Sequence, residues 1–286
     1  MDLYNIQHIK ALLRRHGFHF SKSLGQNFLT ASWVPEQIVA SAELDQDTGV
    51  LEIGPGIGAL TTQLAQTAEH VVAVELDKAL LPILAETLSD FPNTTVVQGD
   101  ILKIDLSALL AEHLPGLRPV VCANLPYNIT TPVLTRLIDS GLFAAITVMV
   151  QREVARRLTA PAGSPDYGAI SLYMAYHTEP KLHFDIPPDC FIPEPKVHSS
   201  VLTLRTREHP LIATNPEALF RVIKAAFANR RKTLVNCLTT ALPSASKEQL
   251  TDLLTNLGHD PRIRGETLDL TAFAHLTDAL LDAKLL

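Results

Sequence analysis

The chain is poor in cysteine, and the cysteines that it has lie far apart. Cys122, Cys190 and Cys237 are the three thiols of the 286-residue sequence. An odd number of distant thiols argues against a disulfide framework, and neither they nor the eleven histidines show metal-ligand spacing. We therefore expect free thiols in a reducing cytoplasm and no bound metal.

Long apolar runs and an excess of basic charge are also missing. No apolar stretch approaches the roughly 20 residues of a membrane helix, and residues 1–15 lack the apolar centre of a secretory signal. The formal net charge is -6, whereas domains that bind nucleic acid are usually basic. We expect a cytoplasmic protein with no membrane partner, in which any binding of nucleic acid depends on local basic clusters.

Between residues 50 and 150, apolar runs alternate with helical patterns. The apolar, β-branched runs predict strands over residues 50–53, 70–75, 94–98, 120–123 and 145–150. Helical patterns predict helices over residues 2–16, 35–42, 59–68, 78–88 and about 131–141. Residues 18–29 show no clear period and predict a loop. Such alternation is typical of an α/β domain with a parallel sheet covered on both faces.

The C-terminal third of the sequence differs from this pattern. Residues 186–195 are rich in proline and predict a loop or an edge, and the alternation over 197–204 predicts one more strand. After about Pro216, only helical patterns remain. We therefore predict a catalytic domain over residues 1–210 and a small all-helical domain over residues 211–286.

A glycine-rich turn follows the first strand of the α/β region. It has the form Glu52-x-Gly54-x-Gly56-x-Gly58, and glycine lets the backbone turn sharply and approach a ligand. The third glycine comes two residues after the second, not three as in the dinucleotide fingerprint. This spacing resembles the nucleoside-binding turn of class I methyltransferases, although a glycine turn alone is also common as a simple connection.

Acidic residues follow the next two predicted strands. Glu75 ends the second strand, where a doubly wound fold places a carboxylate against ribose hydroxyls. Asp100 follows the third strand and suits two roles equally, an acceptor for an adenine amino group or a cap for the next helix. Ligands bind at the carboxyl ends of such strands, so we expect both residues to lie near the glycine turn.

The segment Asn124-Leu125-Pro126-Tyr127 follows the fourth strand. A nucleobase amine is a poor nucleophile because its lone pair is delocalised into the ring. The amide oxygen of Asn124 and the carbonyl of Leu125, made rigid by Pro126, can accept hydrogen bonds from such an amine, while the ring of Tyr127 holds the base flat. An ordinary Asn-x-Pro turn is the alternative, which this position after a strand disfavours.

Distinctive segments stand in a characteristic order along the chain: Gly-Gln-Asn-Phe-Leu at 25–29, the glycine turn at 52–58, Asn-Leu-Pro-Tyr-Asn-Ile at 124–129, Phe-Ile-Pro-Glu-Pro-Lys-Val at 191–197 and Asn-Arg-Arg-Lys-Thr at 229–233. Together they resemble the ribosomal RNA adenine dimethyltransferases of the small subunit, over nearly the whole chain. The resemblance implies a class I methyltransferase Rossmann-like sheet, parallel with a terminal antiparallel strand pair, followed by a small helical C-terminal domain.

The resemblance also implies the reaction. S-adenosylmethionine would be the methyl donor, and the acceptor would be N6 of two adjacent adenines in the 3′-terminal hairpin loop of small-subunit rRNA, within the immature subunit. We expect the protein to act as a monomer. The residues that the family pattern places at the donor are Asn27, Leu29, Gly54, Gly56, Glu75, Asp100 and Asn124.

The same pattern assigns the target adenine to two aromatic residues. Tyr127 and Phe191 would stack on the base, which must leave its own stack to reach the donor. Phenylalanine is most often a core residue, but the proline-rich loop around Phe191 favours a presented ring. The densest basic run is Arg230, Arg231 and Lys232, which we expect on a helix and assign to RNA binding. Two other basic clusters are better explained as solvated helix faces: Lys10, Arg14 and Arg15, and Arg152, Arg156 and Arg157.

Two other functions fit part of the sequence. A large-subunit rRNA adenine methyltransferase of the antibiotic-resistance type shares the glycine turn and an Asn-x-Pro-Tyr site, but Leu125 and the run at 229–233 favour the small subunit. A binding factor for ribosome assembly or transcription could share the fold without catalysis. The intact segment from Asn124 to Tyr127 disfavours that reading.

Overall fold

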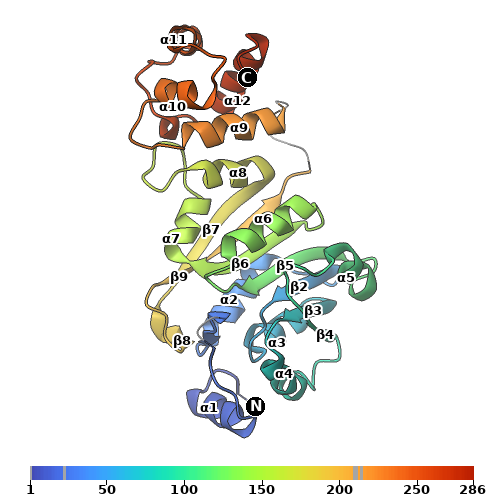
Figure 1. The fold of residues 1–286 in the computed structure, drawn as a ribbon. Coiled ribbons are helices and arrows are strands. Elements are labelled where there is room, and N and C mark those ends of the chain that lie inside the picture. The colour runs from blue at the N-terminus through green and yellow to red at the C-terminus, as the bar shows by residue number, and fades with distance from the viewer. Residues whose placement is uncertain (1, 22–23, 209–211, 213–214) are drawn as a thin grey trace. The chain divides into compact units, whose positions relative to one another are not determined.

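The computed structural model describes residues 2–21, 24–208, 212 and 215–286, and the chain folds into two compact units (Figure 1). The sheet unit comprises residues 1–155 and 181–206, and the helical unit comprises residues 156–180 and 207–286. The expected boundary at residue 210 lies outside the described residues. The helical unit includes residues 156–180 because Tyr167, Leu172 and Tyr176 belong to its apolar core.

The sheet unit is built on a seven-stranded sheet of order β4-β3-β2-β5-β6-β9-β7. The strands from β2 to β6 are parallel, whereas β9 is antiparallel to β6, which confirms the expected sheet type. The strands have these bounds: β2 (Thr48–Ile53), β3 (His70–Glu75), β4 (Thr94–Gln98), β5 (Arg118–Asn124), β6 (Ala145–Gln151), β7 (Thr178–Ile186) and β9 (Ser199–Thr206).

The order of the strands reverses beside β2. From β2 the chain adds β3 and β4 on one side, and it then returns to add β5 on the other side. In the register, Val50 of β2 lies between Val71 of β3 and Val120 of β5, and all three side chains are buried. Such a reversal leaves a crevice at the carboxyl ends of the two central strands, which is where open α/β sheets bind ligands.

The predicted helices of the sheet unit are present with shifted ends. The first begins at Ile6 and not at residue 2, because the side chain of Asn5 accepts the N–H groups of Gln7 and His8 and caps the helix there. The helix α5 was not predicted. The bounds are α1 (Ile6–Arg15), α2 (Trp33–Ala42), α3 (Ala59–Ala65), η2 (Lys78–Leu80), α4 (Leu81–Thr87), α5 (Leu106–His113) and α6 (Thr130–Ser140).

Two short strands lie in segments without a predicted strand, one predicted as a loop (residues 18–29) and one as a loop or an edge (residues 186–195). β1 (Phe28–Leu29) pairs antiparallel with β8 (Phe191–Ile192), so that Leu29 lies opposite Phe191. The prediction of a loop is wrong at residues 28–29, whereas β8 agrees with the edge that was the alternative for residues 186–195. Two residues are too few to show a period of two, and the pairing joins segments that are distant in the sequence.

The helical unit confirms the helices expected after Pro216. Its core includes the fully buried ring of Phe273. The helices of the helical unit are α8 (Ala169–His177), α9 (Pro216–Ala226), α10 (Leu234–Ala241), α11 (Lys247–Asn256), α12 (Leu270–Asp282) and the short η4 (Gly265–Thr267). Of the remaining helices, α7 (Arg152–Leu158) begins in the sheet unit, and the short η3 (Pro188–Cys190) lies in it. In the described chain, no helix combines the length and the apolar character that a membrane crossing needs.

Candidate active site

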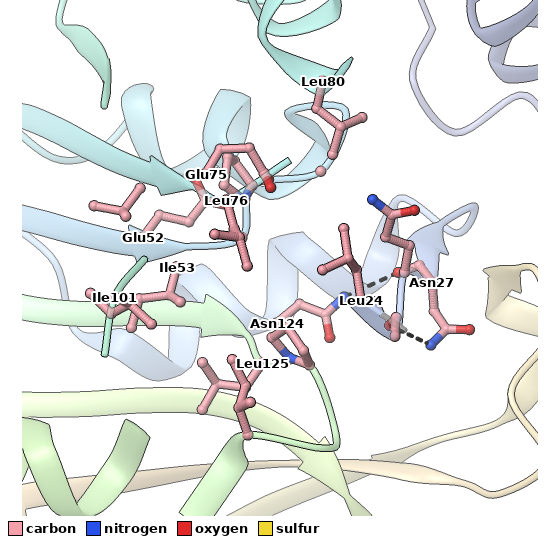
Figure 2. A pocket seen from close by; sticks show the side chains of 18 of the residues that line it. Leu24, Asn27, Glu52, Ile53, Glu75, Leu76, Leu80, Ile101, Asn124 and Leu125 are labelled. Carbon is pink, nitrogen blue, oxygen red and sulfur yellow. Dashed lines mark hydrogen bonds between the residues drawn. The ribbon is translucent and has the colours of Figure 1, made fainter. Parts of the chain in front are cut away.

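A pocket opens at the carboxyl ends of the central strands (Figure 2). Its empty space is about 1080 Å³, the open mouth included. The walls come from the sheet unit: residues 24–29 before and within β1, 52–57 and 59–60 around the glycine turn, 74–76 and Leu80 after β3, 99–101 after β4, and 124–129 after β5. This pocket brings together the predicted residues Asn27, Leu29, Gly54, Gly56, Glu75, Asp100, Asn124, Leu125, Pro126 and Tyr127.

The glycine turn contributes Gly54 and Gly56 to the wall of the pocket. Gly54, Gly56 and Gly58 all have positive φ, at 66°, 62° and 89°. A Cβ atom on Gly56 would also lie 3.1 Å from the ring of Phe28, which lines the same pocket. Glycine is therefore required at position 56 for two reasons, the backbone conformation and the close approach of an aromatic ring.

Glu75 presents a nearly buried carboxylate to the pocket. Only 5% of the residue is exposed, and its Oε1 accepts the N–H of Asp77 at 2.7 Å. Burial raises the pKa of Glu75, and hydrogen bonds from the backbone N–H groups of Asp77 and Gly56 partly oppose this effect. A carboxylate fixed in this way at the end of β3 is suited to accept two hydroxyl groups of a ribose.

Glu52 is a second buried carboxyl group in the wall, and we had not assigned it a role. It is 1% exposed, and its Oε2 has no hydrogen-bond partner among the described residues. Burial raises the pKa of Glu52 to about 8; the Thr61 side chain opposes this rise, and the nearby charge of Glu75 adds to it. Glu52 is therefore mainly neutral at pH 7 and can donate a hydrogen bond. The sequence shows the residue, but only the structure shows its burial.

Asp100 has a local partner as well as a place in the wall. Its Oδ1 accepts the N–H of Leu102 at 3.0 Å, and its Oδ2 lies 3.4 Å from Nζ of Lys103. The helix that follows is capped by Asp105 and not by Asp100. Of the two roles that we left open for Asp100, the cap of the next helix is therefore wrong, and the acceptor for an adenine amino group stays a prediction.

The segment after β5 is fastened on several sides. Nδ2 of Asn124 donates to the backbone oxygen of Asn27 at 3.2 Å, as the dashed line in Figure 2 shows. This bond turns the amide so that its oxygen stays available to accept a hydrogen bond. The N–H of Leu125 donates to the carbonyl of Met149 on β6 at 3.1 Å. The hydroxyl group of Tyr127 lies 2.6 Å from Oγ of Ser199, and burial raises the pKa of this tyrosine.

Phe191 lies outside the wall of the pocket, and its ring is not presented. The residue is 3% exposed and belongs to the apolar core of the sheet unit. The expectation of a presented ring is therefore wrong for this structure. The pairing of β8 with β1 draws Phe191 into the core opposite Leu29, where burial of a phenylalanine is favourable.

The basic run at 230–232 lies in a turn between α9 and α10, and not on a helix as expected. Arg230 is committed to its own unit, because Nη2 donates to the carbonyls of Pro165 (2.8 Å) and Tyr167 (3.0 Å), and Nε lies 3.5 Å from Glu266. Arg231 and Lys232 are exposed. Arg230 is exposed too, so these contacts, and not burial, distinguish it from Arg231 and Lys232.

Comparisons with known proteins agree with this geometry. A model of the ribosomal RNA adenine dimethylase family matches residues 17–272. The ribosomal RNA small subunit methyltransferases A of Geobacillus kaustophilus (strain HTA426) and Streptococcus gordonii (strain Challis) are both 48% identical to the chain over 276 residues. These matches cover 95% of the chain, and 94% and 95% of the relatives.

Solved structures of such enzymes have the same fold. A dimethyladenosine transferase from Plasmodium falciparum superposes with a TM-score of 0.75 at 23% identity, over 90% of this chain and 98% of that one. The 23S rRNA methyltransferase ErmE superposes with a TM-score of 0.70 at 26% identity, over 88% and 99%. These likenesses confirm the expected class I methyltransferase fold. By its sequence over most of its length, the chain belongs to the ribosomal RNA adenine dimethylase family.

Proposed function

We propose that the protein transfers methyl groups from S-adenosylmethionine to N6 of two adjacent adenines in the 3′-terminal hairpin loop of small-subunit rRNA. The observation that carries the proposal is the fixed amide of Asn124, which stands beside Tyr127 in the same pocket as Glu75. An acceptor for an amine and an acceptor for a ribose thus share one pocket. The small-subunit names of relatives at 48% identity support this subunit as the substrate.

The donor half of the pocket fits an adenosyl group with a charged tail. Glu75 offers a carboxylate edge for the ribose, and the glycine turn allows close approach of the backbone. Ile53 and Ile101 add apolar surface on which a purine can lie (Figure 2). The unpartnered Oε2 of Glu52 is a buried polar atom that a ligand would satisfy. Asn27, Leu29 and Asp100 complete the proposed donor site.

The acceptor half would orient the adenine amine. The oxygen of Asn124 and the carbonyl of Leu125 accept the two N–H groups of N6, which favours a localised lone pair that points at the donor. Pro126 restricts the backbone that carries this carbonyl, and the ring of Tyr127 stacks on the base. When bound, S-adenosylmethionine supplies a methyl group whose bond to sulfur breaks as the N6 lone pair bonds to it, and N6 releases a proton to solvent.

The two aromatic residues that we expected to stack on the base, Tyr127 and Phe191, lie in different surroundings. Tyr127 lines the pocket, whereas Phe191 lies in the core behind Leu29. We propose that Phe191 acts from its place in β8, where it supports the β1 segment that carries Asn27 and Leu29. A direct stack on the adenine would require β8 to move.

Contacts with the RNA would come from exposed cations. Because the whole chain is acidic, a base that is splayed out of its loop must be held by local charge. Arg231 and Lys232 are available for phosphate groups, whereas Arg230 holds its own turn. That the protein acts as a monomer stays a prediction, and the ribosomal RNA named for bacterial relatives supports a cytoplasmic site of action on the immature subunit.

The test is transfer of labelled methyl groups from S-adenosylmethionine to immature small subunits that lack the modification. We expect label in N6-dimethyladenosine of the small-subunit rRNA. Primer extension on both rRNAs distinguishes the alternatives, because dimethyladenosine stops reverse transcription. A stop in the large-subunit rRNA alone indicates the resistance-type reaction, and tight binding without transfer indicates an assembly factor; either result refutes the proposal.

A further inference from the structure

The ring of Tyr127 is tied to a buried serine outside the pocket wall. Its hydroxyl group lies 2.6 Å from Oγ of Ser199, a residue that is 0% exposed. Ser199 begins β9, where it lies opposite Gln151 of β6, and the N–H of Arg152 donates to the carbonyl of His198 at 2.9 Å. The backbone that carries Ser199 is therefore held by the sheet.

Tyr127 itself lies in a short connection between β5 and α6. The backbone of this connection is fastened, since the carbonyl of Pro126 accepts both the N–H of Ile129 (3.2 Å) and Oγ1 of Thr130 (3.2 Å). Neither bond restrains the side-chain torsions of Tyr127. The contact with Ser199 does, because it holds the far end of the ring to a strand of the sheet.

The orientation of this ring matters most when the base carries one methyl group. Adenine offers two N–H groups to Asn124 and Leu125, and both would align it. After the first transfer only one N–H remains, so the base depends more on stacking for its alignment. A ring that turns freely would therefore harm the second transfer more than the first.

We propose that Ser199 is a positioning residue that holds the ring of Tyr127 in the plane needed for the second methyl transfer. The proposal rests on the dimethylation proposed above. Ser199 touches no reacting atom in this account, and it acts through Tyr127. It therefore determines how far the reaction proceeds, and not whether it begins.

The chain offers matched variants. Ser199→Ala removes the hydroxyl group from one side of the contact, Tyr127→Phe removes it from the other, and Ser199→Thr retains it. Ser200→Ala is the control, because Ser200 is also 0% exposed but its Oγ donates to Asp185 at 2.5 Å and not to the site. This control makes the same chemical change at the neighbouring buried position.

The experiment is a time course of methylation of immature small subunits, with mono- and dimethyladenosine separated by mass spectrometry. We expect Ser199→Ala and Tyr127→Phe to raise the ratio of mono- to dimethyladenosine by about fivefold or more, with the first transfer slowed less. Ser199→Thr and Ser200→Ala should keep the wild-type ratio. The double variant Ser199→Ala/Tyr127→Phe should resemble Tyr127→Phe, because both changes remove one contact.

A wild-type ratio in Ser199→Ala, or an equal change in Ser200→Ala, overturns the positioning role. Additive losses in thermal stability for the two hydroxyl deletions overturn it as well, because coupled residues are not additive. Failure of the proposed function has a different signature, since the wild-type protein would then form no methylated adenosine at all.

Discussion

Replacing Glu52 by glutamine should change how the stability of the sheet unit depends on pH. The folded protein holds the pKa of Glu52 at about 8, compared with 4.5 for an ordinary glutamate. Between these values the folded state binds one more proton than the unfolded state. The free energy of unfolding therefore falls with rising pH, by about 1.4 kcal/mol per pH unit.

Glutamine carries no such proton. From about pH 5 to about pH 7.5, the stability of Glu52→Gln should therefore improve relative to wild type by roughly 3 kcal/mol, a little less than about 1.4 kcal/mol per pH unit because both titrations are gradual. The sign follows from burial, which disfavours the charged carboxylate. At the lower pH both side chains are neutral, and the two proteins should differ least in their electrostatics.

Urea unfolding measures this difference, and the chain provides its own probe. Trp33 is the single tryptophan and lies on α2, in the same unit as Glu52. Its fluorescence therefore reports the unfolding of the sheet unit. Glu69→Gln, at an exposed carboxyl group of the same unit, is the control and should run parallel to wild type. Parallel curves for Glu52→Gln and wild type would refute the assignment of a neutral buried carboxyl group.

Other substitutions test the remaining parts of the account. Asn124→Ala should lower the rate of methyl transfer by about 100-fold or more, while donor affinity measured by calorimetry changes only a few-fold. Full activity of this variant would exclude the amine-orienting role of Asn124. Gly56→Ala should weaken donor binding at least tenfold in the same calorimetry, because its Cβ would lie 3.1 Å from an aromatic ring at positive φ. Arg230→Ala should lower the thermal midpoint by several degrees, since it leaves backbone carbonyls without their donor. Arg231→Ala/Lys232→Ala should instead weaken rRNA binding and reduce its salt dependence, and a salt slope equal to that of wild type would remove these cations from the interface.

Much of the pocket was predictable because it follows from local patterns. The alternation between residues 50 and 150 specifies parallel strands, and the carboxyl ends of parallel strands lie at one edge of a sheet. Glu75, Asp100 and Asn124 could therefore be placed together before any coordinates were known. The glycine spacing identified which of these strands carries the turn that we predict to bind a nucleoside.

The parts that could not be predicted depend on contacts between distant segments. The pairing of Leu29 with Phe191 involves strands of two residues, and it reverses the exposure that a proline-rich loop suggests for the phenylalanine. The commitment of Arg230 to carbonyls near residue 166 is likewise invisible in a run of basic letters. The raised pKa of Glu52 follows from its burial, which composition does not reveal.

The central claim is that this chain places two methyl groups on each of two adjacent adenines of small-subunit rRNA. The most direct measurement is mass spectrometry of nucleosides and of 3′-terminal rRNA fragments from cells with and without the gene. We predict that N6-dimethyladenosine at two adjacent positions near the 3′ end of the small-subunit rRNA disappears on deletion and returns with the wild-type chain, but not with Asn124→Ala. Unchanged dimethyladenosine in the small-subunit rRNA of the deletion strain would contradict the account.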